Sequence, residues 1–185
     1  MKYQNTVILK NGKECLIRNA CKEDVDAVLK LYIQTHSETD FLAAYGDESS
    51  PTSRQEAMFL QDKEESEYNV ELIAVVDSKV VGCAGNTMIS SRVKMRHRAE
   101  FGVSVIKDYW NIGIGKELLK ACIACARKAG FEQMELEVVK DNTHALAMYK
   151  SFGFTEYGCN PKGFKKRNGE YQELVSMRKE IKAEY

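Results

Sequence analysis

Trp110-Asn-Ile-Gly-Ile-Gly-Lys116 follows the apolar run Phe101–Ile106 and opens a helical pattern over Glu117–Ile123. The pattern predicts a strand that enters a glycine-bearing turn at the start of a helix. The first amides of a helix lack partners within it, and the helix dipole adds about half a positive charge at that end. Glycine lets the backbone approach an anion where a Cβ would collide. The stretch therefore predicts a binding site for a phosphate group.

The composition indicates a globular protein. The chain has 185 residues, of which 44% are hydrophobic and 29% are charged, and we expect one domain spanning residues 1–185. Lys plus Arg and Asp plus Glu both number 27, so the formal net charge is zero. Zero net charge disfavours a nucleic-acid partner, because proteins that bind polyanions usually carry an excess of basic residues.

The amino-terminal residues contain no apolar signal segment, and no apolar run approaches the ~18 residues that a membrane helix needs. We therefore expect a cytoplasmic protein with no membrane partner. Most of the six cysteines lie among apolar residues, which indicates reduced thiols in the core. Cys122 and Cys125 lie in mid-helix without a second pair of ligands, so packing is favoured over metal binding and no metal is expected.

Residue patterns predict strands mixed with helices. Asn11-Gly12 between two apolar stretches indicates a tight hairpin, because both residues accept positive φ. Pro51 and Ser53-Arg-Gln-Glu56 indicate a capped helix start. Early hairpins followed by β-α-β units indicate one α/β domain with a mixed sheet. The predicted strands cover residues 6–10, 14–18, 70–76, 79–89, 98–106, 133–139, 154–158 and 171–178, and the predicted helices cover 23–35, 53–63, the glycine turn to 128, and 142–151.

Two groups of basic residues are expected to face solvent. Arg92, Lys94, Arg96 and Arg98 alternate, which places them on one face of a predicted strand. Residues 162–167 contain a second group, which precedes Asn168-Gly169 at an expected hairpin tip. Either group could attract an acidic substrate or a phosphate, but a solvated surface is the favoured interpretation.

Two further features accompany the glycine turn. Glu100 lies on the strand that enters the turn, and Asn142 to Phe154 forms a helical segment that ends in Gly-Phe. With these features in this order, the chain resembles the GNAT superfamily of acetyl-CoA-dependent N-acetyltransferases over roughly residues 17–177. Gly113 and Gly115 match the glycines of the family's pyrophosphate-binding turn. Trp110 stands where the family motif has Gln or Arg, so recognition must depend on backbone amides.

The resemblance implies a mostly antiparallel sheet of about seven strands, splayed in the middle and flanked by about four helices. It also implies acetyl-CoA as cosubstrate, held between the strands of residues 100–106 and 133–139. The residues expected to contact the coenzyme are Val103, Ser104, Val105, Trp110, Asn111, Ile112, Gly113, Ile114, Gly115, Lys116, Asn142 and Tyr149.

Two residues match catalytic positions of the family. Glu100 matches the carboxylate base, which acts directly or through water, and we expect Phe101 and the neighbouring strands to bury it. Tyr149 matches the acid that protonates the departing sulfur. Alternatives remain open at this stage. Glu100 could instead pair with a neighbouring cation such as Arg98, and Tyr149 could simply pack against neighbouring phenylalanines. Trp110 either covers the coenzyme or packs beneath the turn, and Asn142 either caps its helix or reaches the coenzyme.

The resemblance implies an acyltransferase that acetylates a primary amine of a small molecule, peptide or protein by direct attack in a ternary complex. We expect the acceptor to enter over residues 37–50 and the strands around residues 86–89. Glu38, Asp40, Asp47 and Glu48 would suit a cationic amine, but an exposed acidic loop is the favoured interpretation of these residues. The alternative is a non-catalytic acyl-CoA sensor or interaction domain on the same fold. Whether the protein forms a homodimer is left open.

Overall fold

The computed structural model describes residues 1–48 and 50–182. In these ranges eight strands form a sheet in the order β1-β2-β3-β4-β5-β6-β8-β7. The strands are β1 (Gln4–Ile8), β2 (Glu14–Asn19), β3 (Val70–Val76), β4 (Lys79–Met88), β5 (Arg98–Val105), β6 (Gln133–Val139), β7 (Thr155–Lys165) and β8 (Tyr171–Glu180). The helices are α1 (Val25–Glu38), α2 (Ser53–Glu65), α3 (Ile114–Lys128) and α4 (Thr143–Ser151), with short 3-10 helices η1 (Lys22–Asp24) and η2 (Lys107–Tyr109).

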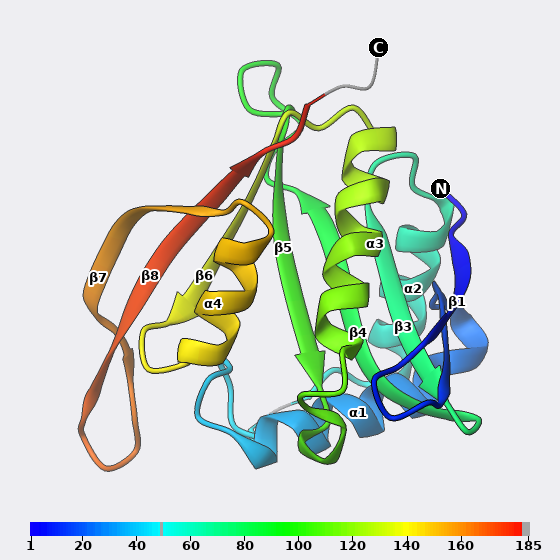
Figure 1. Cartoon of the computed structure of the whole chain (residues 1–185), viewed down its shortest axis with the longest axis horizontal. Helices are drawn as coiled ribbons and strands as arrows, with labels where there is room; N and C mark the ends of the chain where they lie inside the picture. The colour runs from blue at the N-terminus through cyan, green and yellow to red at the C-terminus, as the bar shows by residue number, and fades with distance from the viewer. Residues whose placement is uncertain (49, 183–185) are drawn as a thin grey trace.

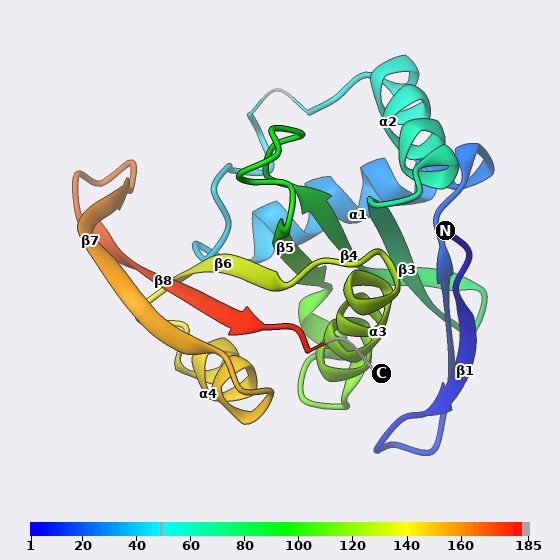
Figure 2. The ribbon, with the colours of Figure 1, turned by 90° about the horizontal axis from the view of Figure 1, so that it is seen from above.

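Helices cover both faces of the sheet. Helices α1 and α2 lie on one face, whereas α3 and α4 lie on the other (Figures 1 and 2). Neighbouring strands pair antiparallel except β5 and β6, which run parallel. The mixed, mostly antiparallel sheet with flanking helices is confirmed. Its eight strands in the described residues agree in number with the residue patterns, whereas the resemblance implied about seven.

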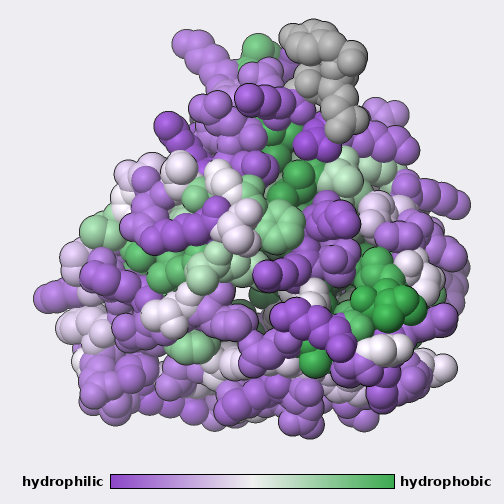
Figure 3. Space-filling view, viewed as in Figure 1, coloured by the Kyte–Doolittle hydropathy of each residue, from purple (hydrophilic) through white to green (hydrophobic). Residues whose placement is uncertain are grey.

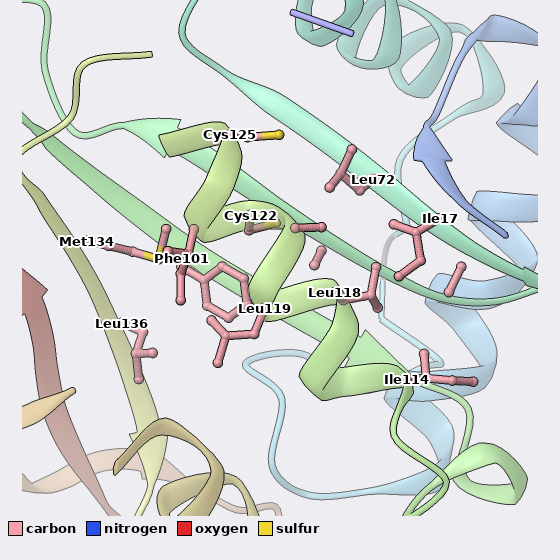
Figure 4. Close-up of a cluster of buried hydrophobic side chains, with 14 of the residues drawn as sticks. Ile17, Leu72, Phe101, Ile114, Leu118, Leu119, Cys122, Cys125, Met134 and Leu136 are labelled. Carbon is pink, nitrogen blue, oxygen red and sulfur yellow. The ribbon is translucent and has the colours of Figure 1, made fainter. Parts of the chain in front are cut away.

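Helix α3 supplies much of the larger core. Its apolar side chains recur every three to four residues and point at the sheet, as Ile114, Leu118, Leu119 and Cys122 do in Figure 4. Complete burial of one such aliphatic side chain contributes roughly 1.5–3 kcal/mol to folding. Cys122 is fully buried in this core, so its packing role is confirmed.

A smaller core lies on the opposite face. Val25 and Val28 of α1 and Leu60 of α2 pack there against Ile73 of β3. This packing fixes α1 and α2 against the sheet and so sets the shape of the face beside β5. Among the described residues, none of the helices has the length and apolar character needed to span a membrane.

The β1–β2 connection and the start of α2 differ from their predicted positions because of local hydrogen bonds. Only Gly12 of the Asn11-Gly12 pair has positive φ, at 81°, and the connection spans residues 9–13 rather than two residues. The helix cap is Thr52, whose side chain accepts a hydrogen bond from the Gln55 amide while Gln55 reaches back to Thr52. The capping box therefore lies one residue before the predicted one.

One prediction for a basic segment was wrong, and one strand is longer than predicted. Residues 91–97 form turns in which the amides of Met95 and Arg96 both bond to the Arg92 carbonyl, so the alternating basic residues do not share a strand face. Strand β7 continues to Lys165, beyond its predicted end at residue 158, because an irregularity in its pairing with β8 between residues 160 and 164 accommodates Pro161 and Gly163 at the sheet edge. The hairpin tip expected at Asn168-Gly169 is present, and most of the basic residues of 162–167 are exposed, as predicted.

Candidate active site

Strands β5 and β6 separate part of the way along the sheet. They pair only at three positions, where residues 98–100 face residues 133–135. Beyond these pairs the two ribbons diverge (Figure 1), and the space-filling view has a narrow opening at the same place (Figure 3). The splay expected in the middle of the sheet is therefore present.

The backbone of β5 presents hydrogen-bonding groups to this gap. The Arg98 carbonyl and the Ile106 amide both bond to the β4 side, to the Ile89 amide and the Val81 carbonyl. Because backbone direction alternates along a strand, Phe101, Val103 and Val105 direct their N–H and C=O groups toward β6. Strand β6 pairs with β5 as far as Glu100, and the described residues place no strand beside Val103 and Val105, so this part of the edge is available to an extended ligand.

The glycine turn lies at the end of β5 and starts α3. Gly113 is the N-cap residue, and its φ of 110° is a left-handed conformation that favours glycine. The first helical bond runs from the Glu117 amide to the Gly113 carbonyl. The amides of Ile114, Gly115 and Lys116 therefore have no acceptor within the helix, and Gly113 has no side chain to cap them.

These features fit a diphosphate. A Cβ on Gly115 would lie 3.6 Å from the Met148 sulfur, an ordinary contact, so the protein itself does not need glycine there. The space is instead suited to close approach of an anion to the first turn of α3. The predicted residues of the turn, from Asn111 to Lys116, are brought together beside the open edge of β5.

Trp110 fastens this turn to the strand before it. Its Nε1–H donates a hydrogen bond to the Val105 carbonyl oxygen, with 2.6 Å between N and O. The residue is 36% exposed, so the indole is neither buried beneath the turn nor free in solvent. Its bond takes the Val105 carbonyl and leaves the Val105 amide facing the gap. Trp110 thus positions the end of β5 relative to the turn.

Tyr149 lies on the α4 side of the gap. Its ring centroid is 6.2 Å from that of Phe101 on β5 and 5.7 Å from that of Phe154. The residue is only 6% exposed, and burial raises the pKa of its phenol well above the usual value. Tyr149 therefore stays protonated at neutral pH, as a proton donor must. It also packs against aromatic residues, so the two interpretations of this tyrosine are compatible.

Asn142 caps α4. Its Oδ1 accepts a hydrogen bond from the Ala145 amide at 3.2 Å. The side-chain oxygen of Asn142 is therefore used to cap the helix, whereas its side-chain NH2 group makes no hydrogen bond within the described residues. Capping is the interpretation that the geometry favours most directly.

Glu100 lies on the opposite face of β5, toward α1 and α2. Its register partners are Thr87 on β4 and Glu135 on β6. Arg98 bonds to Glu135 rather than to Glu100, with 2.7 Å between Nη2 and Oε2, and this pairing lowers the pKa of Glu135. Glu100 is exposed and makes no ion pair among the described residues, so the burial expected for it is not found.

Residues between α1 and α2 form the wall of a cavity of about 550 Å³ on this side. Arg167, from the β7–β8 hairpin, pairs with Asp47 through two hydrogen bonds of 2.8 and 2.6 Å. Its guanidinium also lies 4.2 Å from the Tyr45 ring centroid. Glu38, the last residue of α1, accepts a hydrogen bond from the amide of Lys107 in η2, so the two ends of this cavity wall are tied to the hairpin and to the segment after β5.

Sequence reasoning missed Glu71 on β3. It is the charged residue within the otherwise apolar run Val70–Val76, and burial raises its pKa to about 7. The interruption of an apolar strand by a carboxylate was the available signal, but its meaning depends on which residues lie across the sheet.

With this geometry in place, comparisons with known proteins identify the family. A model of the acetyltransferase (GNAT) family matches residues 27–154. The L-amino acid N-acetyltransferase AaaT of Escherichia coli is 28% identical over 165 residues, covering 89% of this chain and 96% of that protein. A GNAT-family acetyltransferase structure from Streptococcus pneumoniae has a TM-score of 0.86 at 28% identity, covering 91% of this chain and 99% of that one.

A phosphinothricin acetyltransferase of Sinorhizobium meliloti, solved in complex with acetyl-CoA, shares the fold with a TM-score of 0.80 at 18% identity, covering 90% of this chain and 88% of that one. The family model spans well over half of the sequence, so the chain belongs to the GNAT acetyltransferase family. It is an acyltransferase, and acetyl-CoA is its acetyl donor.

Proposed function

We propose that this enzyme acetylates a primary amine by direct attack on acetyl-CoA in a ternary complex. The observation that carries the proposal is the gap between β5 and β6, with the anion-binding turn at one end and Tyr149 on one wall. The Escherichia coli relative is named for L-amino acids, whose α-amino group is a primary amine. Amines of small molecules, peptides and proteins are all candidate acceptors.

Acetyl-CoA supplies an activated acyl group. The backbone amides of residues 112–116 hold its diphosphate, helped by the dipole of α3. The main-chain groups of Val103 and the amide of Val105 pair with the amides of its pantetheine arm as a neighbouring strand would. A main-chain N–H on this edge polarises the thioester carbonyl and stabilises the negative charge that develops on its oxygen.

The reaction needs two proton transfers, and each is assigned to a residue on a different face of the sheet at β5. On the exposed face, Glu100 attracts the acceptor's ammonium group and helps to remove its proton. The neutral nitrogen then forms a C–N bond as the C–S bond breaks. On the other face, Tyr149 donates its proton to the departing sulfur. The base and the acid act on opposite sides of the thioester, so they come from different elements, Glu100 from β5 and Tyr149 from α4.

A second candidate is a non-catalytic acyl-CoA sensor on the same fold. The turn alone would serve a sensor, whereas a protonated tyrosine beside the gap also suits a reaction that releases a thiolate, and the relatives are named as N-acetyltransferases. We therefore favour the enzyme, acting in the cytoplasm as one domain and without a nucleic-acid, membrane or metal requirement.

Two measurements test the proposal. A ligand that binds only the folded state at ~100 times its Kd stabilises it by about 2.7 kcal/mol, so acetyl-CoA should raise the Tm clearly. Thiol release from acetyl-CoA should then be followed across amino acids, polyamines, aminoglycosides and peptides. Absence of a thermal shift would contradict coenzyme binding. A shift without turnover on any acceptor would support the sensor instead.

A further inference from the structure

Glu71 stands at one end of a line of three residues that crosses the sheet. Its register partner on β4 is Gly85, and the partner of Gly85 on β5 is Gly102. Glu71 alternates with Ile73, whose side chain packs against α1 and α2, so the carboxylate lies on the same face as Glu100. This is the face from which the acceptor approaches in the proposed reaction.

The two glycines leave bare backbone between Glu71 and the gap. A Cβ on Gly85 would lie 2.2 Å from Oε2 of Glu71, so the carboxylate leans across β4 toward β5. A Cβ on Gly102 would meet nothing within 4 Å, so the surface beyond the carboxylate is open. We call the backbone surface formed by Gly85 and Gly102 the floor. Strands in a sheet are ~4.8 Å apart, which places the carboxylate about one strand from the edge where the thioester would lie.

Charged groups from α2 surround this carboxylate. Glu56 and Lys63 lie on the inward face of α2 with exposed fractions of 8% and 6%. The Lys63 ammonium donates to the Asn86 carbonyl at 3.1 Å and to the Thr87 hydroxyl at 2.5 Å, rather than to Glu71. Glu71 therefore has no ion pair within the described part of the chain.

Glu71, Glu56 and Lys63 form a cluster whose electrostatics favour gain and loss of a proton by Glu71 near neutral pH. Burial raises the pKa of Glu71 to about 7, against the opposing effect of the Lys63 charge, and Glu56 and the Cys83 thiol also face it. Burial likewise lowers the pKa of Lys63 and raises that of Glu56. Charged side chains cost free energy when buried, so a cluster of them beside a reaction site indicates a functional use.

We propose that Glu71 is the carboxylate that accepts the proton of the acceptor amine, across the Gly85–Gly102 floor and directly or through one water. This inference rests on the proposed acetyl transfer and completes its first step. Glu100 at the exposed mouth attracts the ammonium group and helps to remove its proton by passing it inward, and Glu71 is the final acceptor of that proton. The nitrogen lone pair is then free to form the C–N bond, and Glu71 later returns the proton to solvent.

The test compares Glu71→Gln with Glu56→Gln, which removes a neighbouring buried acid that does not lie on the floor. For each variant, kcat/KM for an active amine is measured from pH 5.5 to 9, with the acetyl-CoA Kd from calorimetry and the Tm. For the unmodified enzyme we expect an inflection near pH 7. In Glu71→Gln this inflection should vanish and kcat should fall at least ~100-fold, while the acetyl-CoA Kd changes less than twofold. Glu56→Gln should retain the inflection, moved to lower pH because one charge that raises the Glu71 pKa is removed, and it should lose far less activity than Glu71→Gln.

A third variant tests the floor itself. Gly102→Ala adds a methyl group where the protein has space, so it should fold normally but raise the acceptor KM. If kcat of Glu71→Gln stays within threefold of that of the unmodified enzyme, or if the inflection persists, Glu71 is not the base. The proposed acetyl transfer would not be affected by this result. Parallel loss of acetyl-CoA binding would also overturn the role of Glu71 as the base, in favour of a structural role. Absence of turnover in the unmodified enzyme would instead contradict the proposed function.

Discussion

The indole Nε1–H of Trp110 and the carbonyl oxygen of Val105 are joined by a hydrogen bond of 2.6 Å between N and O. This bond connects the last residue of β5 to the turn that precedes α3. The two parts of the coenzyme site, the open strand edge and the helix amides, are thereby held in one fixed relation. A residue that departs from the family motif thus has a structural role that Gln or Arg would fill differently.

Trp110→Phe keeps an aromatic ring but removes the donor. We expect about 1 kcal/mol lower stability from the lost hydrogen bond, and a several-fold weaker acetyl-CoA Kd because the turn is less well held. Calorimetry and thermal unfolding measure the two effects, with Tyr109→Phe as the matched control nearby. An unchanged Kd would mean that the backbone of the turn keeps its shape without the indole.

Tyr149→Phe removes only the phenolic oxygen from a buried ring. Because the aromatic contacts with Phe101 and Phe154 remain, the Tm and the acetyl-CoA Kd should change little. Loss of the proton donor should lower kcat by roughly 100-fold. Steady-state kinetics measure this, with Tyr157→Phe as the control on the other side of the sheet. Normal turnover would exclude Tyr149 as the acid.

Arg167→Ala separates the connection between α1 and α2 from the β7–β8 hairpin. The pair with Asp47 is exposed, so we expect a stability change below ~1 kcal/mol. The loosened wall of the acceptor cavity should raise the acceptor KM several-fold and leave the acetyl-CoA Kd unchanged. Lys166→Ala is the control, because Lys166 pairs within the hairpin, with Glu170. Equal KM values for the two variants would argue against a role for this wall.

Asp24→Asn tests the electrostatics at the start of α1. Burial opposes ionisation of Asp24, but hydrogen bonds from Arg18 and Cys21 prevail and lower its pKa from 3.8 to about 2. A lowered carboxyl pKa stabilises the fold above pH ~4, and that stabilisation is lost as the pH falls through about 2. The variant should therefore lose about 2 kcal/mol at pH 7 and almost nothing near pH 2. Urea unfolding at both pH values decides this, with exposed Asp26→Asn as control; a pH-independent difference would contradict it.

Local sequence patterns were sufficient to predict elements whose own residues determine where they begin and end. The glycine turn followed by an amphipathic stretch predicted α3 to end at Lys128, and the apolar run after it predicted β6 at residues 133–139. Both elements are buried on the side that the periodicity indicates. The cap at Asn142 was also readable, because Asn is favoured where helix amides lack partners.

Long-range pairing decided the rest. Nothing near Glu71 in the sequence indicates that two glycines lie beside it, because Gly85 and Gly102 join it only through strand register. The alternation from Arg92 to Arg98 looked like a strand, yet turn hydrogen bonds at Arg92 break it. Glu100 was expected to be buried by its neighbours, but a sheet residue's exposure depends on what covers that face.

The separation of β5 from β6 divides the sheet into five strands on one side and three on the other, joined directly over three residue pairs. A donor molecule that bonds to the free edge acts as a cross-link between these two mechanical units. In the proposed complex the sheet is therefore expected to be stiffer with the donor bound than without it, and release of the product coenzyme removes the cross-link.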